Sequence, residues 1–125
     1  MVKSIISAVV GFIILITASL IEQNVVTKTF NEFNNKLTTL QMKTENEIAT
    51  ETDALIVQEF WIEKKKTLHV IIPHNEIKEI DLWISEAVCL IKTENYLDAL
   101  AKLEVAIELV EQIPKTFSVT LANVL

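Results

Sequence analysis

An uncharged apolar segment near the amino terminus constrains this chain more than any other feature. The 18 residues from Ser4 to Ile21 carry no charge, and most of them are isoleucine, valine, leucine or other apolar residues. As a helix rising about 1.5 Å per residue, they would reach about 27 Å, close to the thickness of the hydrocarbon core of a bilayer. The sequence therefore predicts an N-terminal transmembrane anchor over residues 1–21, with residues 4–21 inside the bilayer.

A cleaved signal peptide is the main alternative for this segment. Signal peptides usually have an apolar region of about 7–15 residues that ends in small residues at the cleavage site. Here the apolar region is longer, and the best candidate site, Thr17-Ala18-Ser19, is followed by further apolar residues. We expect an uncleaved anchor, and a buried helix of a soluble protein is the third alternative.

The charges that flank the segment indicate its orientation. Positive residues close to a transmembrane helix favour the cytoplasmic side. Lys3 precedes the segment and Glu22 follows it, so we expect a single-pass protein of the cytoplasmic membrane with its C-terminal domain outside. Of the 11 Lys, only Lys3 lies before residue 22, so residues 22–125 carry 10 Lys and 17 acids, a net −7. Anionic headgroups should repel this part, which is expected to stand off the membrane.

Composition excludes several classes of function. The whole chain has a formal net charge of −6, which would be repelled by a nucleic-acid backbone, so nucleic acid is not an expected partner. Phosphate-binding loops and tight hairpins depend on glycine, and Gly11 is the only one in the sequence. The single Cys89 rules out an internal disulfide and a thiolate metal cluster.

Apolar residues at helical spacing predict an all-α fold. After the anchor, a stripe of residues alternates spacings of four and three, which is typical of a helix that packs one face against a partner. The sequence therefore predicts that the transmembrane helix continues into a helical stalk over residues 22–44. The stripe consists of Val26, Phe30, Phe33, Leu37, Leu40 and Thr44.

Residues 45–125 are predicted to form a helical bundle domain. Thr44-Glu45-Asn46-Glu47 has the form of a capping box, which would begin a second helix near residue 45. Pro73 disfavours helical geometry at the residue before it, so this helix should end at Ile72.

A third and a fourth helix are predicted to form an antiparallel hairpin. The third should begin at His74 or Asn75, and the fourth should follow Thr93-Glu94-Asn95, with Asn95 as its N-cap and Pro114 closing it. The tail from Phe117 to Leu125 is expected to be a final turn or a strand-like cap. The apolar stripes are Ile77, Ile80, Ile84, Val88 and Ile91 on the third helix, and Tyr96, Ala99, Leu100, Leu103, Ile107, Val110 and Ile113 on the fourth.

Five short strings of the chain form a recognisable series. They are Phe60-Trp61-Ile62-Glu63-Lys64-Lys65-Lys66, Ile72-Pro73-His74-Asn75-Glu76-Ile77, Asp98-Ala99-Leu100-Ala101-Lys102-Leu103, Gln112-Ile113-Pro114 and Asn123-Val124-Leu125. In this order they resemble a family of small membrane-anchored helical proteins from spore-forming Gram-positive bacteria, the domain-of-unknown-function family 4363. The resemblance covers essentially the whole chain and implies the same anchor followed by a helical hairpin. Two departures are Pro73, where the family tends to have Asp before His, and Ala122, where it usually has Glu.

Two tryptophans are the candidate partner surface. Large aromatic side chains are enriched in protein interfaces, so Trp61 and Trp83 could contact another protein, although packing in the core is the role we expect first. No spacing in the sequence predicts a catalytic residue, a cofactor-binding residue or a metal ligand. His69 and His74 lie five residues apart with Pro73 between them, which does not match a pair of metal ligands on one helix face. A pH-linked role for these two histidines is the other alternative to an ordinary surface position.

The basic run and the cysteine have simpler interpretations. Lys64, Lys65 and Lys66 fan out around a helix and are expected to form a solvated face rather than one patch. Cys89 lies one residue from the apolar stripe and is expected to be a small helix-face residue, with a cross-link between two copies as the alternative.

These observations predict a membrane-anchored, extracytoplasmic helical module that binds protein and has no enzymatic activity or cofactor. Its expected partners are the bilayer, through residues 4–21, and another membrane protein or a second copy of itself. Two alternatives remain: a sensory or ligand-binding helical domain acting through a membrane partner, and a structural coiled-coil protein of the division-protein type.

Overall fold

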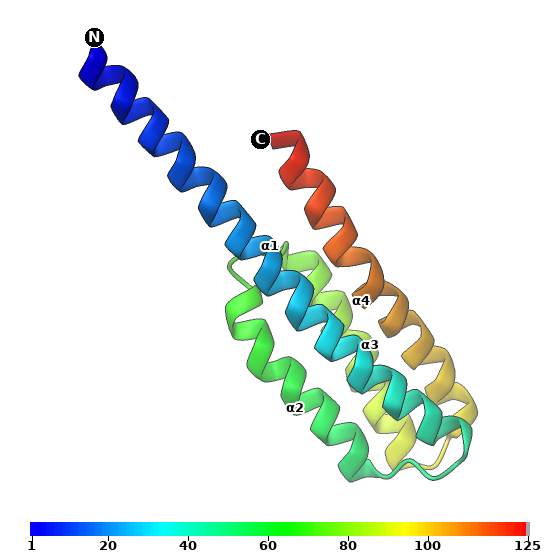
Figure 1. Ribbon diagram of the computed structural model, residues 1–125. Helices are drawn as coiled ribbons and strands as arrows, with labels where there is room; N and C mark the ends of the chain where they lie inside the picture. Colours follow the sequence, from blue (N-terminus) through cyan, green and yellow to red (C-terminus); the bar gives the residue numbers. More distant parts are fainter. Residues whose placement is uncertain (125) are drawn as a thin grey trace.

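Four α-helices make up the described part of the chain (Figure 1). The computed structural model describes residues 1–124, with side chains described for residues 1–117. No strand occurs within these residues, so the predicted all-α fold is confirmed. The helices are α1 (Val2–Glu45), α2 (Glu51–Leu68), α3 (His74–Lys92) and α4 (Tyr96–Val124).

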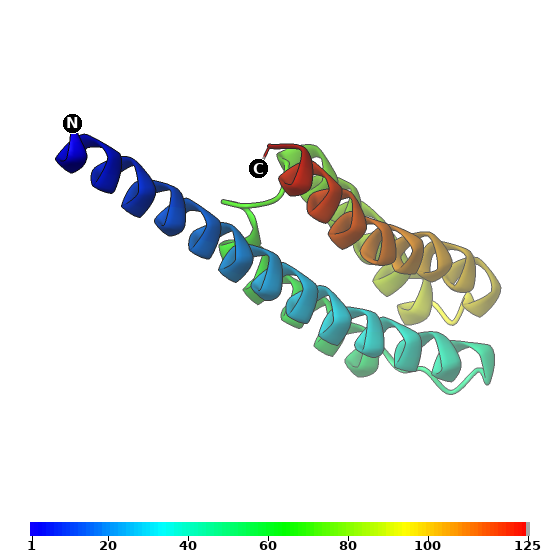
Figure 2. The ribbon, with the colours of Figure 1, turned by 45° about the horizontal axis from the view of Figure 1, so that its top comes forward.

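Helix α1 is a single helix of 44 residues with two different surroundings. Its N-terminal part projects beyond the other helices, and its second half packs among them (Figures 1 and 2). All six residues of the predicted stripe from Val26 to Thr44 are buried, so the continuation of the apolar segment into a packed helix is confirmed. Because the stripe packs against α2 and α4 of the same chain, residues 26–44 share one core with the helices that follow.

The four helices form an antiparallel bundle. Helix α1 packs against α2 and α4, and α3 packs against the same two helices from the other side. Aromatic rings fill the contact between α1 and α2: the ring of Phe33 stacks on Phe60 at 5.8 Å and on Trp61 at 5.1 Å between centroids. The largest fully buried side chains are those of Trp61, Phe30, Phe33, Leu37, Leu68, Ile80, Ile84, Ile91 and Leu103.

The predicted start of the second helix is wrong, because the helix begins at Glu51 and not near residue 45. Thr44 is still helical, and its hydroxyl donates to the Leu40 carbonyl at 2.7 Å instead of capping a new helix. The capping box that operates is formed by Thr50 and Asp53, where the Thr50 hydroxyl accepts from the Asp53 N–H and the Asp53 carboxylate accepts from the Thr50 N–H. Between the two, Glu47 takes a left-handed φ of 57°, which turns the chain from α1 into α2.

The end of α2 also differs from the prediction. The helix stops at Leu68 rather than Ile72, and a short turn follows in which the Ile72 N–H bonds to the Leu68 carbonyl at 2.8 Å. This turn places the Ile72 side chain in the core, 3% exposed, before Pro73 leads into α3. The unwinding therefore satisfies the backbone restriction that Pro73 imposes and keeps Ile72 buried.

The α3–α4 hairpin confirms the predicted starts of both helices at His74 and Tyr96. Asn95 directly precedes α4, its carbonyl accepts from the Ala99 N–H, and its side-chain amide donates to the Asp98 carboxylate at 3.0 Å. Of the apolar stripes predicted for these two helices, Ile80, Ile84 and Leu103 are buried, and Leu100 and Ile107 are partly buried.

The predicted end of the fourth helix at Pro114 is wrong, because α4 continues through this proline to Val124. A proline inside a helix removes one N–H and so frees the carbonyl four residues earlier, here that of Val110. Ile113 is buried and Phe117 packs against the core, so the apolar face of α4 continues past the proline and offsets this loss. The tail expected as a turn or strand-like cap is therefore helical as far as Val124, and Leu125 lies outside the described residues.

Candidate functional site

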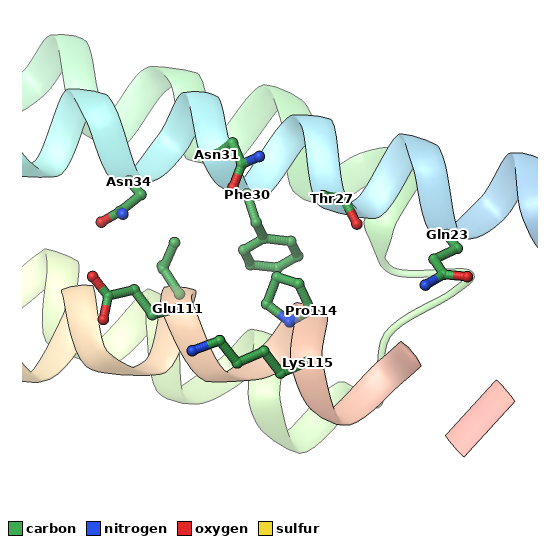
Figure 3. A pocket seen from close by; sticks show the side chains of 9 residues that line it. Gln23, Thr27, Phe30, Asn31, Asn34, Glu111, Pro114 and Lys115 are labelled. Atoms are coloured by element: carbon green, nitrogen blue, oxygen red, sulfur yellow. The ribbon is translucent and has the colours of Figure 1, made fainter. Parts of the chain in front are cut away.

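A groove of about 510 Å³ lies between α1 and α4, at the end of the bundle from which the apolar segment projects (Figure 3). Phe30 and Val110 form its floor: both are buried members of the apolar stripes on the two helices. Pro114 continues that floor on the α4 side. The residues next to these apolar stripes on both helices lie at the edge of the core and line the walls of the groove.

The α1 wall of the groove carries amide and hydroxyl side chains. Gln23, Thr27, Asn31 and Asn34 occur at spacings of four, four and three, which places them on one face of α1. Asn34 extends from α1 toward α4 in Figure 3, and its side-chain oxygen is buried without a hydrogen-bond partner among the described residues. A buried acceptor without a partner costs free energy, which a donor group entering the groove would recover.

The α4 wall carries opposite charges one turn apart. Glu111 and Lys115 are both exposed and both line the groove, on either side of Pro114 along the helix (Figure 3). The groove therefore offers amide, hydroxyl, carboxylate and ammonium groups, a set suited to hydrogen bonding with a polar chain segment.

Trp61, one of the two candidate partner residues, is in the core. It is 1% exposed, and its indole N–H donates to the Asp81 carboxylate at 2.6 Å. Lys65 also reaches this carboxylate, at 3.1 and 3.2 Å, so Asp81 joins α3 to two residues of α2. The interpretation of Trp61 as a partner surface is corrected accordingly, because the packing of α1, α2 and α3 encloses its ring.

Trp83 lies apart from Trp61 and is partly buried. The ammonium of Lys102 sits 4.9 Å from the centroid of its ring, and the same ammonium pairs with Glu86 at 3.0 Å. The structure thus brings Trp83 together with α4 of its own chain, and a contact between Trp83 and a partner stays a prediction.

The histidines and the lysine run occupy the α2–α3 end of the bundle. The rings of His69 and His74 are 5.6 Å apart between centroids, and both residues are exposed. Within the described residues, no group of three His, Cys, Asp or Glu side chains has a geometry that could hold a metal ion. The three lysines go to three different neighbours: Lys64 lies over the Phe60 ring, Lys65 pairs with Asp81, and Lys66 pairs with Glu63.

Sequence reasoning did not identify the groove, although a signal for it exists. The stripe on the fourth helix continues as Val110, Ile113 and Phe117, at spacings of three and four across Pro114. That continuation indicates a helix with an interior proline, and the polar residues Glu111 and Lys115 beside this proline would then have been candidates for binding. Cys89 is exposed on α3, away from the groove.

Comparison with known proteins places most of the chain in one family. A family model described as Domain of unknown function (DUF4363) matches residues 20–124. No curated protein and no solved structure shows significant similarity to the chain.

Proposed function

We propose that this chain, which belongs to the family Domain of unknown function (DUF4363), is a membrane-anchored helical module that binds another protein at the outer face of the cytoplasmic membrane. In this proposal α1 fixes the module in the bilayer. The bundle presents the groove between α1 and α4 close to the membrane surface, and the partner is a membrane protein or a second copy of the chain.

The observation that carries the proposal is the uncovered apolar part of α1. This helix is long and apolar enough to cross a membrane, and none of its most apolar stretch is buried by the rest of the chain. Ile14 and Leu15 are 61% and 62% exposed. Such a continuous apolar surface is unfavourable in water and favourable in hydrocarbon.

A signal sequence can be as long and as apolar as this segment, so these two properties do not distinguish it from an anchor. The continuity of α1 supports the anchor. The helix runs without interruption from the apolar segment to the buried stripe that begins at Val26. The charges of Lys3 and Glu22 favour the orientation with the bundle outside.

The side chains of the groove support binding rather than catalysis as its role. Amides and hydroxyls such as those of Asn31, Asn34 and Thr27 donate and accept hydrogen bonds without changing charge near neutral pH. The side-chain oxygen of Asn34 is a buried acceptor without a partner among the described residues, so a hydrogen bond from a donor group of the partner, such as a backbone N–H, would stabilise the complex.

The same unpaired acceptor favours a second candidate function, a sensory domain that takes a small polar ligand in the groove and acts through a membrane partner. The coiled-coil alternative has less support. The heptad stripe of α1 ends at Thr44, and it packs against α2 and α4, which leaves it unavailable to another chain.

The native cysteine gives a direct test of anchoring and topology. Cys89 is exposed on α3 and is the only cysteine in the chain. We expect the full-length protein in the membrane fraction, and we expect a membrane-impermeant maleimide to label Cys89 in intact protoplasts. The Cys89→Ser variant is the labelling control. Recovery of a shortened soluble protein, or labelling only after lysis, would contradict the proposal.

A photo-crosslinker attached to a cysteine tests the groove itself, in a Cys89→Ser background. At Asn31, on the α1 wall, we expect a discrete protein adduct in intact membranes. At Glu79, which is exposed on α3, we expect none. Adducts of the same size from both positions would argue against the groove as the binding surface, and capture of a small molecule at Asn31 would favour the sensory alternative.

A further inference from the structure

The connection between α2 and α3, residues 69–73, lies at the end of the bundle that faces the apolar part of α1 (Figures 1 and 2). Helix α2 runs antiparallel to α1, and the stacking of Phe33 on Phe60 fixes their register. Leu68, eight residues beyond Phe60, therefore lies level with about residue 25 of α1, since both helices rise equally per residue. The connection begins directly after that level.

This level corresponds to the headgroup layer of a bilayer spanned by α1. The uncharged segment ends at Ile21, and four residues of helix span only about 6 Å. The polar layer on each side of the hydrocarbon core is about 5–7 Å thick, from a total of about 40–45 Å around a core of about 30 Å. A chain segment at this height meets the headgroups without any bending of α1.

An apolar side chain projects from the connection at this point. Val70 is 88% exposed, whereas its neighbours Ile71 and Ile72 are partly and fully buried in the core. The packing of these two isoleucine side chains in the core holds the turn in place and leaves the Val70 side chain exposed. The backbone N–H groups of Val70, Ile71 and Ile72 are bonded to carbonyls of α2, so the turn can enter a poorly hydrated layer without leaving these donors unsatisfied.

Charge is distributed along the bundle in the same sense. The half nearer the apolar segment comprises residues 22–33, 60–83 and 108–117, and it contains six Lys and eight acids, a net −2. The far half, residues 34–59 and 84–107, contains four Lys and nine acids, a net −5. Repulsion from anionic headgroups is therefore weakest at the end that faces the membrane.

We propose that the α2–α3 connection is a second membrane contact, in which residues 69–73 rest in the headgroup layer and Val70 reaches toward the acyl chains. The occupant of this surface is the bilayer that α1 crosses, so the inference rests on the proposed anchor. It replaces the expectation that the acidic domain stands off the membrane, because the acidity is concentrated in the far half. This contact restrains the tilt of the bundle, and with it the height of the α1–α4 groove above the lipid.

Single labelled cysteines in the full-length protein test this contact. In a Cys89→Ser background, an environment-sensitive fluorophore is attached at Val70→Cys, at Leu97→Cys and at Ile14→Cys, one position per sample. The protein is reconstituted in phosphatidylcholine vesicles with a minority of phosphatidylglycerol, with or without a lipid carrying a quencher near its headgroup. Leu97 is the matched control, because it is 81% exposed and begins α4 at the far end of the bundle.

We expect quenching at Val70 to be several-fold stronger than at Leu97, together with a blue-shifted emission. The Ile14 label reports on the anchor alone. A blue-shifted Ile14 label combined with equal quenching at Val70 and Leu97 would overturn the second contact and leave the anchor intact. A water-exposed Ile14 label would overturn the anchor, and the second contact with it.

Discussion

At the scale of single residues, two leucines of α4 allow the contribution of a buried side chain to stability to be compared with that of an exposed one. Leu103 is 1% exposed in the core of the bundle, whereas Leu97 is 81% exposed on the same helix. Truncating Leu103 to Ala removes buried methyl groups and leaves a cavity, so we expect a loss of about 2–5 kcal/mol in the free energy of unfolding. Urea unfolding followed by circular dichroism measures this loss.

The Leu97→Ala variant is the control for this measurement, with an expected change within about 0.5 kcal/mol because the side chain is already in solvent. A Leu103→Ala protein that unfolds at the wild-type midpoint and loses a cross-linked partner would mean that this stripe of α4 is an interaction surface.

Trp61 is both a core residue and a hydrogen-bond donor to a charged group, so the contribution of that hydrogen bond to stability can be tested separately. Trp61→Phe keeps most of the ring packing against Phe33 and removes the N–H that reaches Asp81 at 2.6 Å. A hydrogen bond to a charged partner contributes about 1.5–3 kcal/mol, so we expect a loss in that range from urea unfolding.

Trp83→Phe provides the comparison, since Trp83 makes a cation–π contact with Lys102 that is worth about 0.5–1 kcal/mol near a surface. Equal losses for the two variants would show that the Trp61–Asp81 hydrogen bond adds nothing beyond packing.

At the scale of elements, the first turn of α2 makes the bundle sensitive to acid. The pKa of Asp53 is lowered below its ordinary value of 3.8, first by the hydrogen bond from the Thr50 N–H and then by that from Lys43, whose ammonium lies 3.1 Å away. A carboxylate whose pKa is lower in the folded than in the unfolded protein stabilises the folded state at pH values above the unfolded pKa. This stabilisation is lost as pH falls through the folded pKa.

The Asp53→Asn variant tests this dependence, because the amide oxygen can still accept from Thr50 but the side chain no longer titrates. We expect wild type to have the higher melting temperature near neutral pH, and the difference to shrink at a pH well below 3.8. A difference that stays constant with pH would assign the effect to hydrogen bonding alone.

The same turn shows how far the sequence alone could predict these elements. Thr44-x-x-Glu47 and Thr50-x-x-Asp53 both satisfy the spacing of a capping box, and spacing cannot distinguish them. The choice depends on burial: Thr44 fills the last position of the α1 stripe, which keeps α1 helical to Glu45. The long apolar segment of α1 and the stripes follow from periodicity, and the starts of α3 and α4 follow from Pro73 and Asn95, because each of these signals depends on residues close together in sequence.

The candidate site was less predictable because it depends on which helices become neighbours. The burial of Trp61 requires α1, α2 and α3 to enclose one ring, and the groove requires α1 and α4 to lie side by side. Pro114 illustrates the same point, since local propensity predicts the end of a helix there and the packing of Ile113 and Phe117 overrides it.

At the scale of the whole molecule, the bundle core includes the second half of α1, and this determines which fragments can fold. Val26 is the first buried residue of the chain, so a fragment of residues 22–125 keeps every described core position and lacks only the apolar segment. We expect this fragment to be soluble, almost wholly helical by circular dichroism, and to unfold cooperatively in urea.

A fragment of residues 45–125, the bundle domain expected from the sequence, provides the decisive comparison. It lacks the whole buried stripe of α1 and leaves Trp61 and the inner faces of α2 and α4 without their neighbour. Burying one large apolar side chain is worth about 1.5–3 kcal/mol, and a small domain has a net stability of only about 5–15 kcal/mol. The loss of the α1 stripe therefore exceeds what α2, α3 and α4 can offset, and we expect this fragment to be aggregated or to lack a cooperative transition. If it instead unfolds at the same urea midpoint as residues 22–125, the stripe of α1 is dispensable to the core and residues 22–44 act as a separate stalk.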